Sequence, residues 1–255
     1  MLTIVQDGAV TILSMQDVAK RNVLSAAMIA GLAQGIRLLT STTRVVVLRA
    51  APECPVWCAG FDIGALGPGV DPLAPDAPLM QLFHTVRDCP VPVVAMVRGG
   101  CWGGGADLAL RCDLLIADTT CTLAFTPGRI GLPYDTDGLR HVLHRAGLAL
   151  AMEMFVTGQP VGAARALQAG LINQVTEPDA LEATTMGLAR QIAALAPLSV
   201  QSAKAQLRAL ARATVVPPDV QAVLDEGRAR ALGSDDYRAG VAGFLARRPV
   251  EFRGQ

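Results

Sequence analysis

The chain has 255 residues, with 22 Lys and Arg against 22 Asp and Glu, so its formal net charge is zero. A balanced charge provides no overall field toward nucleic acid or an anionic membrane, and neither partner is predicted. Apolar stretches are interrupted well short of a membrane span and the first residues lack a signal-peptide pattern, which predicts a cytoplasmic protein. The six cysteines lack C-x-x-C spacing and are predicted to be reduced core residues.

The first half of the chain alternates short β-branched runs with helical patterns. Strands are predicted at residues 10–13, 45–48, 93–97 and 114–117, and helices at residues 25–40 and 104–111. Residues 64–78 are rich in Gly, Pro and Asp, which predicts a mobile surface loop. This order is typical of an α/β fold made of β-β-α or β-α-β units.

After residue 135 the pattern is almost wholly helical. Helices are predicted over residues 148–156, 161–169, 180–194, 197–213, 220–232 and 235–246. The interpretation is an α/β core over residues 1–195 followed by a helical region over residues 196–255. Because 51% of the residues are hydrophobic and only 4% aromatic, part of the apolar surface is expected to lie between subunits.

Two glycine-bearing segments contain the pattern with the clearest chemical meaning. Residues 58–63 read CAGFDI and residues 99–107 read GGCWGGGAD. Glycine lets the main chain approach a ligand without a Cβ, and both segments adjoin helix-like runs, where unpaired N–H groups gather. Two N–H donors aimed at one point stabilise a carbonyl oxygen that gains negative charge. The segments therefore predict an oxyanion hole.

Other site classes are disfavoured by spacing. The glycines of residues 99–105 do not follow G-x-G-x-x-G, no G-K-[ST] follows them, and there is no G-x-S-x-G elbow. His141 and His144 are three residues apart, but no third ligand is placed beside them, so no metal site is predicted. With Arg140 and Arg145 they predict a solvated basic face.

The order of three motifs carries a resemblance to a known family. CAGFDI at residues 58–63 is followed by WGGGAD at 102–107 and by FTPGRIGLPY at 125–134. Together they resemble the crotonase superfamily, also called the enoyl-CoA hydratase/isomerase family, over nearly the whole chain. The resemblance implies a crotonase-like ββα spiral core with C-terminal helices used in trimerisation, and a homotrimer or a dimer of trimers.

The same resemblance implies a coenzyme A thioester as the ligand, with coenzyme A entering as part of the substrate and no separate cofactor. The thioester oxygen is expected between the backbone N–H groups of Phe61 and Gly104 while an enolate forms. Asp107 and Tyr134 are the further catalytic candidates. The expected substrate-binding residues, with the first two near the phosphates, are Lys20, Arg21, Val23, Cys58, Gly60, Asp62, Ile63, Trp102, Gly103, Pro127 and Asp135.

The residues around these motifs disfavour hydration. Hydratases of the family use one carboxylate at the position of Asp107 and a second directly after the proline of the F-x-x-P segment. Here Pro127 is followed by Gly128 and Arg129, so the second carboxylate is missing. Hydration needs a general acid and a general base on the same face, and this site has lost one of them.

A decarboxylase fits the same residues better. One branch of the family, the methylmalonyl-CoA decarboxylases, has a similar W-G-G run and a similar L-G-x-P-Y segment. Loss of CO2 from a malonyl-type thioester gives the enolate directly, so no strong base is needed. Tyr134 is expected to orient the departing carboxylate or to help deliver a proton. The chain departs from that branch at Phe61, Asp107 and Asp135, where the branch has His, Glu and Asn.

Several alternatives stay open from the sequence. An enoyl-CoA hydratase or isomerase is the second reading. Asp135 stands where related dehalogenases keep a nucleophilic Asp, so a thioester hydrolase or dehalogenase is a third, although a surface or helix-capping role is also compatible. If Asp107 and Tyr134 are only packed, the chain is a non-catalytic CoA-binding oligomer.

Overall fold

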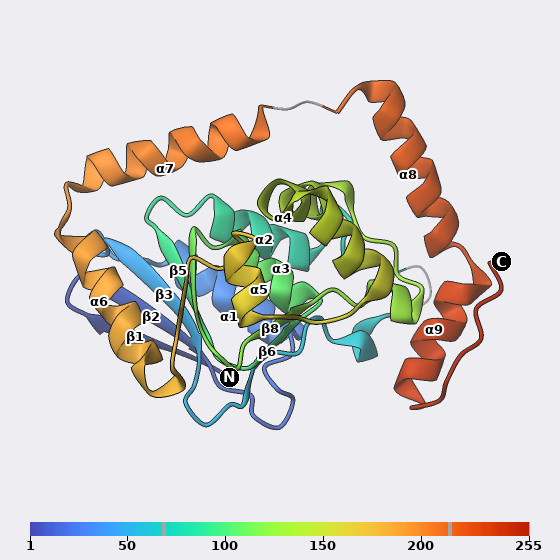
Figure 1. Cartoon of the computed structure of the whole chain (residues 1–255), viewed down its shortest axis with the longest axis horizontal. Coiled ribbons are helices and arrows are strands. Elements are labelled where there is room, and N and C mark those ends of the chain that lie inside the picture. Colours follow the sequence, from blue (N-terminus) through green and yellow to red (C-terminus); the bar gives the residue numbers. More distant parts are fainter. Residues whose placement is uncertain (68–69, 214–215, 255) are drawn as a thin grey trace.

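Successive β-β-α units build the core, and each unit gives one strand to each of two sheets (Figure 1). The structure is a computed structural model and describes residues 1–67, 70–213 and 216–254. The three units contain β3 (Val45–Ala50), β4 (Val56–Cys58) and α2 (Pro78–Arg87); β5 (Val93–Val97), β6 (Gly100–Trp102) and α3 (Gly104–Arg111); and β7 (Leu114–Asp118), β8 (Thr122–Ala124) and α4 (Thr136–Thr157). The predicted crotonase-like ββα core is confirmed.

The larger sheet has six strands in the order β1 (Leu2–Asp7), β2 (Val10–Met15), β3, β5, β7 and β10 (Gln174–Thr176). Its strands are parallel except for the β1–β2 pair. Every residue of β5 is buried, as expected for a central parallel strand that is covered on both faces. The smaller sheet joins β4, β6 and β8 in parallel and ends with antiparallel β9 (Val161–Gly162).

Helices cover both faces of the larger sheet. The main core lies between the two sheets and α1 (Ala26–Arg37), α2 and α3, and α6 (Leu181–Ala194) packs on the opposite face. The remaining elements are α5 (Ala163–Gln168), α7 (Pro197–Arg212), α8 (Pro218–Leu232), α9 (Asp235–Leu245) and the 3-10 turns η1 (Ile63–Ala65), η2 (Pro127–Ile130) and η3 (Pro178–Ala180). All six cysteines are buried and unpaired, as predicted.

The C-terminal helices leave the core and then return to it. In Figure 1, α7 and α8 run outside the sheets as two long arms, and α9 lies back against the body of the molecule. Neither α7 nor α8 contains a buried residue among those described. Lys204 and Arg208 attach α7 to the core through Asp113. Residue 195 falls in the turn between α6 and α7, and the division into two parts there stays a prediction.

The strands predicted at residues 10–13, 45–48, 93–97 and 114–117 and the helix at 104–111 are confirmed. The short strands β4, β6 and β8 were not predicted, because three residues show no period. Helix α4 has a kink at Gly147, with φ 71°, and the predicted helix at 148–156 corresponds to the part of α4 after the kink, while the part from Thr136 was not predicted. No helix in the described part of the chain is long and apolar enough to cross a membrane.

The predicted surface loop at residues 64–78 is wrong in part. It contains the end of η1 and the buried side chains of Leu66 and Leu73. Residues 68 and 69 of the predicted loop lie outside the described residues. The sequence suggested an exposed segment because Gly, Pro and Asp dominate it, but its leucines point into the core.

Candidate active site

A pocket of about 630 Å³ opens where the second and third β-β-α units meet the segment after β4. Its walls come from residues 59–61 and Ile63, from 102–104 at the start of α3, from η2 and the chain after it, from Pro72 and Leu73, and from Phe244 of α9. A pocket of this size can enclose most of a medium-sized organic ligand.

Two backbone N–H groups meet in this pocket. A Cβ placed on Gly104 would lie 3.5 Å from the nitrogen of Phe61, and one placed on Gly60 would lie 3.5 Å from the nitrogen of Gly104. Within residues 1–67, 70–213 and 216–254, neither of these N–H groups donates a hydrogen bond. Both residues line the pocket. Two free donors so close together can bind one oxygen atom, which is the geometry of an oxyanion hole.

Glycine is required for this close approach. Gly60 has φ 97° and Gly103 has φ 53°, conformations that L side chains rarely adopt. A Cβ on Gly60 would lie 2.8 Å from the carbonyl oxygen of Trp102, and one on Gly105 would lie 2.7 Å from the sulfur of Cys58. The glycines therefore allow α3 to begin directly against β4 and the turn that follows it.

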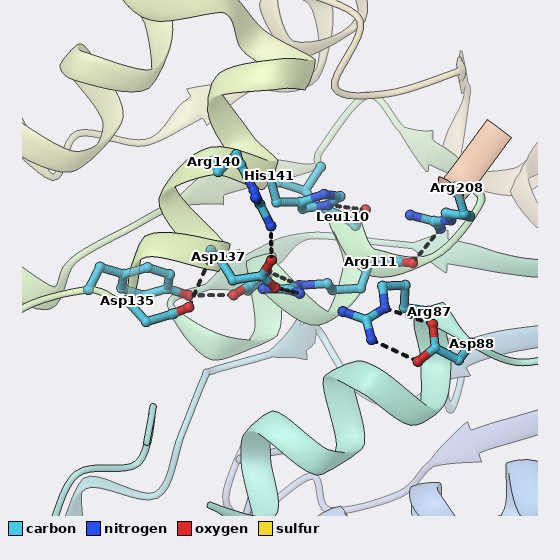
Figure 2. Close-up of polar contacts among 12 residues, drawn as sticks. Arg87, Asp88, Leu110, Arg111, Asp135, Asp137, Arg140, His141 and Arg208 are labelled. Carbon is cyan, nitrogen blue, oxygen red and sulfur yellow. Dashed lines mark hydrogen bonds and ion pairs between the residues drawn. The ribbon is translucent and has the colours of Figure 1, made fainter. Parts of the chain in front are cut away.

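Behind the pocket lies a buried network of charged side chains. Asp107 is fully buried and accepts hydrogen bonds from Arg111 Nε and from the Tyr134 hydroxyl, each at 2.9 Å. Arg111 Nη1 donates to Asp137 at 2.6 Å, and Asp137 also accepts from Arg140 at 2.8 Å. Figure 2 shows Arg111, Asp137 and Arg140 in one chain of contacts. Asp107 is thus paired on both oxygens.

The network sets the charge states of its members. Burial lowers the pKa of Arg111, but its ion pairs with Asp107 and Asp137 outweigh burial and raise that pKa above its ordinary value. Burial raises the pKa of Asp137, yet Arg111 and Arg140 outweigh it and hold that pKa well below its usual range. Burial, and then the neighbouring Asp107, raise the pKa of Tyr134 well above its ordinary value. Tyr134 therefore keeps its proton at neutral pH.

Sequence reasoning missed Arg111 and Asp137. The helix at residues 104–111 reads GGADLALR, in which the two charged residues are four apart and every other residue is small or apolar. Such a pair in a helix with no polar face indicates a buried ion pair at i and i+4, and this signal was present.

Asp135 lies beside this network but outside the pocket lining. Its Oδ1 accepts the N–H of Gly138 at 2.9 Å and caps α4, while its Oδ2 is buried with no partner among the described residues. Burial is the main cause that raises the pKa of Asp135. The residue is therefore a buried helix cap, and the surface position considered from the sequence is wrong.

The other predicted binding residues divide into two groups. Arg21, Gly60, Ile63, Trp102, Gly103 and Pro127 line the pocket. Lys20, Val23, Cys58 and Asp62 are not among the described lining residues. Cys58 is a buried thiol whose pKa burial raises to about 12, and the Asp62 carboxylate accepts the Gly64 N–H at 3.1 Å. These two residues support the turn after β4 from behind.

His141 does not belong to a solvated basic face, contrary to the sequence prediction. Its Nε2 lies 2.7 Å from the carbonyl oxygen of Leu110, and burial lowers its pKa to about 4 (Figure 2). Arg145 likewise turns inward and donates to the Cys112 carbonyl oxygen at 3.2 Å. Of the two histidines, only His144 is exposed. His141 faces inward because α4 packs against the C-terminal end of α3, where His141 meets Leu110 and Asp137 meets Arg111.

His141 predicts a loss of stability in mild acid. Between its ordinary pKa of about 6.5 in the unfolded chain and about 4 in the folded chain, only the unfolded state takes up the proton, so stability falls as the pH is lowered through this range. The gap corresponds to about 3 kcal/mol at its limit. Urea denaturation at pH 7.5 and pH 5 should show a smaller pH dependence for His141→Gln than for the original chain. The exposed residue gives the control, His144→Gln, and equal pH dependence in both variants would contradict the assignment.

Comparison with known proteins agrees with the fold. The family model described as Enoyl-CoA hydratase/isomerase matches residues 6–255. The methylmalonyl-CoA decarboxylase of Escherichia coli strain K12 is 35% identical over 237 residues, which cover 92% of this chain and 91% of that protein. A putative enoyl-CoA hydratase of Thermus thermophilus is 31% identical over 254 residues, covering 97% and 99%.

Solved structures give the same result. A methylmalonyl-CoA decarboxylase in complex with 2-nitronate-propionyl-CoA superposes with a TM-score of 0.96 at 33% identity, covering 100% of this chain and 98% of that one. An enoyl-CoA hydratase/isomerase from Pseudoalteromonas atlantica T6c superposes with a TM-score of 0.84 at 26% identity, covering 99% of both. The chain therefore belongs to the enoyl-CoA hydratase/isomerase family, the crotonase superfamily, and is an enzyme of that family that acts on acyl-CoA.

Proposed function

We propose that this enzyme is a lyase that decarboxylates a malonyl- or methylmalonyl-type CoA thioester. One observation carries the proposal: no Asp or Glu is found among the described residues that line the pocket. The nearby carboxylate of Asp107 is fully buried and bonded to Arg111 and Tyr134. A hydratase needs an acid and a base at the substrate, whereas decarboxylation needs neither to form the enolate.

The reaction proceeds through an enolate held by the backbone. The bond between the α-carbon and the carboxylate breaks, CO2 leaves, and the electron pair moves into the thioester, whose oxygen becomes negative. The N–H groups of Phe61 and Gly104 donate to that oxygen, where one such donor contributes about 2.7 to 4 kcal/mol of transition-state stabilisation. The enolate carbon then takes a proton from a solvent water, which leaves as hydroxide. Because the Tyr134 hydroxyl donates its hydrogen to Asp107, the lone pairs of its oxygen are free to accept a hydrogen bond from such a water and orient it.

The buried network suits a substrate with a negatively charged acyl group. A lone Asp107 carboxylate one hydrogen bond behind the pocket wall would repel the substrate carboxylate. Arg111 compensates this charge, and Arg140 pairs with Asp137 behind it. At the pocket itself, Arg21 and Arg129 bring positive charge. The pocket therefore has positive charge that can attract an anionic acyl group, and its described lining residues include no carboxylate that could act as a base.

The coenzyme A arm is assigned to the turn after β4. Arg21, with Lys20 beside it, contacts the phosphates, and the backbone of residues 58–63 holds the adenine and pantetheine. Ile63, Trp102, Gly103 and Pro127 give the pocket wall, while Val23, Cys58 and Asp62 support it. This assignment is supported by the position of Arg21, Gly60, Phe61 and Ile63 in the pocket lining.

The second candidate is an enoyl-CoA hydratase or isomerase, favoured by the similarity to relatives of that description. It would require Asp107 to act as a base through Tyr134 or to leave Arg111. Hydrolysis or dehalogenation by Asp135 is less well supported, because that carboxylate caps α4 and is not among the described lining residues. A non-catalytic CoA-binding oligomer is the remaining reading.

Steady-state assays separate these candidates. We expect CO2 release from methylmalonyl-CoA or malonyl-CoA and no loss of enoyl absorbance with crotonyl-CoA. Turnover of crotonyl-CoA without CO2 release from either malonyl thioester contradicts the proposal and favours the hydratase. Binding of all three thioesters without any turnover favours the non-catalytic oligomer.

A homotrimer or a dimer of trimers is proposed for the assembly. Leu148, Met152 and Val156 lie four residues apart on α4 and are 65%, 56% and 74% exposed. An apolar stripe of this kind is typical of a surface covered by another subunit.

We expect the double variant Met152→Glu, Val156→Glu to shift the protein to monomers, because burying two carboxylates in an apolar interface is costly. Sedimentation velocity gives the measurement. Leu38→Glu, at an exposed leucine after α1, controls for the added charge. A double variant with the mass of the unaltered assembly would place the interface elsewhere.

A further inference from the structure

Side chains of α8 and α9 form hydrogen bonds with residues 70 and 71, which directly precede two residues of the pocket wall, Pro72 and Leu73. Arg228 of α8 makes two hydrogen bonds to Asp71, Nη1 to Oδ2 and Nη2 to Oδ1, each at 2.6 Å. Both side chains are only 17% exposed. The Tyr237 hydroxyl of α9 donates to the carbonyl oxygen of Val70 at 3.2 Å. Arg228 thus holds the side chain of Asp71 and Tyr237 holds the main chain of Val70, although each pair is at least 157 positions apart in the chain.

The contact between Arg228 and Asp71 also fixes the residues that line the pocket. Asp71 Oδ1 also accepts the N–H of Leu73 at 2.9 Å, so the same carboxylate that binds Arg228 fixes the turn through Pro72. Pro72 and Leu73 line the pocket, and the Leu73 side chain is buried. The ion pair is therefore one residue from the wall that contacts a bound acyl-CoA.

Helix α9 supports a second part of the pocket wall, at η2. A Cβ on Gly240 would lie 2.4 Å from the carbonyl oxygen of Ile130, and one on Gly131 would lie 2.9 Å from the Cα of Tyr237. The backbones of α9 and η2 are thus in direct contact, and Phe244 of α9 reaches the pocket itself. The pocket wall at Pro72 and Leu73 and the wall at η2 are therefore held by contacts with α8 and α9. The proposed oxyanion donors, Phe61 and Gly104, are positioned instead by the turn after β4 and the start of α3.

We propose that Arg228 is a positioning residue that fixes the acyl-binding wall through Asp71 and thereby sets which acyl groups the pocket accepts. The proposal rests on the proposed function only in that this pocket binds the acyl part of a CoA thioester. A planar guanidinium that binds a carboxylate through two parallel hydrogen bonds fixes orientation as well as distance, and lysine cannot replace it. Because the described residues of α8 are not buried, the loss of Arg228 should alter the wall without unfolding the core.

Binding measurements test the proposal independently of the reaction. Isothermal titration with propionyl-CoA and with free coenzyme A is carried out on the full-length enzyme. We expect Arg228→Met to weaken propionyl-CoA binding about tenfold or more while free coenzyme A binds as before, because only the acyl wall has moved. Arg228→Lys should resemble Arg228→Met. In steady state, KM for the substrate should rise more than kcat falls.

Further variants identify the cause. Arg238→Met removes a surface ion pair with Asp235 in the adjoining helix and should bind both ligands normally. Asp71→Asn keeps an oxygen that can accept the Leu73 N–H but loses the charge that binds Arg228, so it should weaken propionyl-CoA binding much as Arg228→Met does, and the double variant should bind no worse than either single one. Normal propionyl-CoA binding by Arg228→Met overturns the proposal, and so does equal weakening of both ligands or a double variant in which the two losses simply add. If the enzyme releases no CO2 but these binding results hold, the proposed reaction fails and the positioning role stands.

Discussion

Gly104→Pro is expected to lower kcat/KM for the CoA thioester by about 10²- to 10³-fold, which is the effect of losing one oxyanion donor. Gly104 is the first residue of α3, a position where proline fits a helix because its N–H has no helical partner. The substitution removes the proposed donor and places the proline Cδ where the amide hydrogen pointed, while the helix can still form. Thermal unfolding should show a midpoint close to that of the unaltered enzyme, and steady-state kinetics give the rate.

Gly104→Ala is the matched control. A Cβ at this position would meet Phe61 N at 3.5 Å and the side chains of Leu24 and Leu79 at 3.6 Å, which are ordinary contact distances. The alanine variant keeps the N–H and should retain most of the activity. Full activity of Gly104→Pro, or an equal loss in both variants, would show that this N–H is not the donor.

Arg111→Met is expected to lower the free energy of unfolding by about 3 to 5 kcal/mol, because it leaves the fully buried Asp107 carboxylate without its cation. Urea denaturation monitored by circular dichroism measures the change. The double variant Asp107→Asn, Arg111→Met removes both charges and should recover much of the loss. Arg165→Met, which breaks a solvent-exposed pair with Glu153, serves as the control and should leave the urea midpoint nearly unchanged.

The activity of the double variant also tests whether the reaction needs Asp107 as a base. If the double variant is stable and still decarboxylates, Asp107 is not required as a base, in agreement with the proposed chemistry. A double variant as unstable as Arg111→Met would mean that Arg111 acts through contacts other than Asp107, such as its bond to Asp137 or its position over the Phe83 ring, 5.2 Å from the centroid.

Local patterns predicted part of the fold and of the site. The run Val93–Val97 reads as a buried strand because it is apolar throughout, and Gly104–Arg111 reads as a helix because Ala, Leu and Arg, which are good helix formers, follow its two glycines. The two glycine-bearing segments indicated an oxyanion hole because glycine lets the main chain approach a ligand, and the family resemblance assigned its donors to the N–H groups of Phe61 and Gly104. The strand, the helix and the glycine segments depend on neighbouring residues only.

What the sequence did not predict depends on partners far along the chain. Strand β6, at Gly100–Trp102, exists because β4 and β8 lie on either side of it, and three residues give no signal of that pairing. The inward position of His141 depends on the carbonyl of Leu110, and that of Arg228 on Asp71, 157 residues away. The basic neighbours of His141 suggested a solvated face, and no local pattern indicated the partner of Arg228.

The pairing of β4 with β6 has a consequence for the proposed donors. Phe61 follows β4 and Gly104 follows β6, and these two strands are parallel neighbours, with Cys58 opposite Cys101. Neighbouring strands lie about 4.8 Å apart because backbone hydrogen bonds fix that spacing. The distance between the donors is therefore a property of the sheet and not of any side chain. Substitutions around the acyl group can change the reaction while the width of the oxygen-binding gap stays the same.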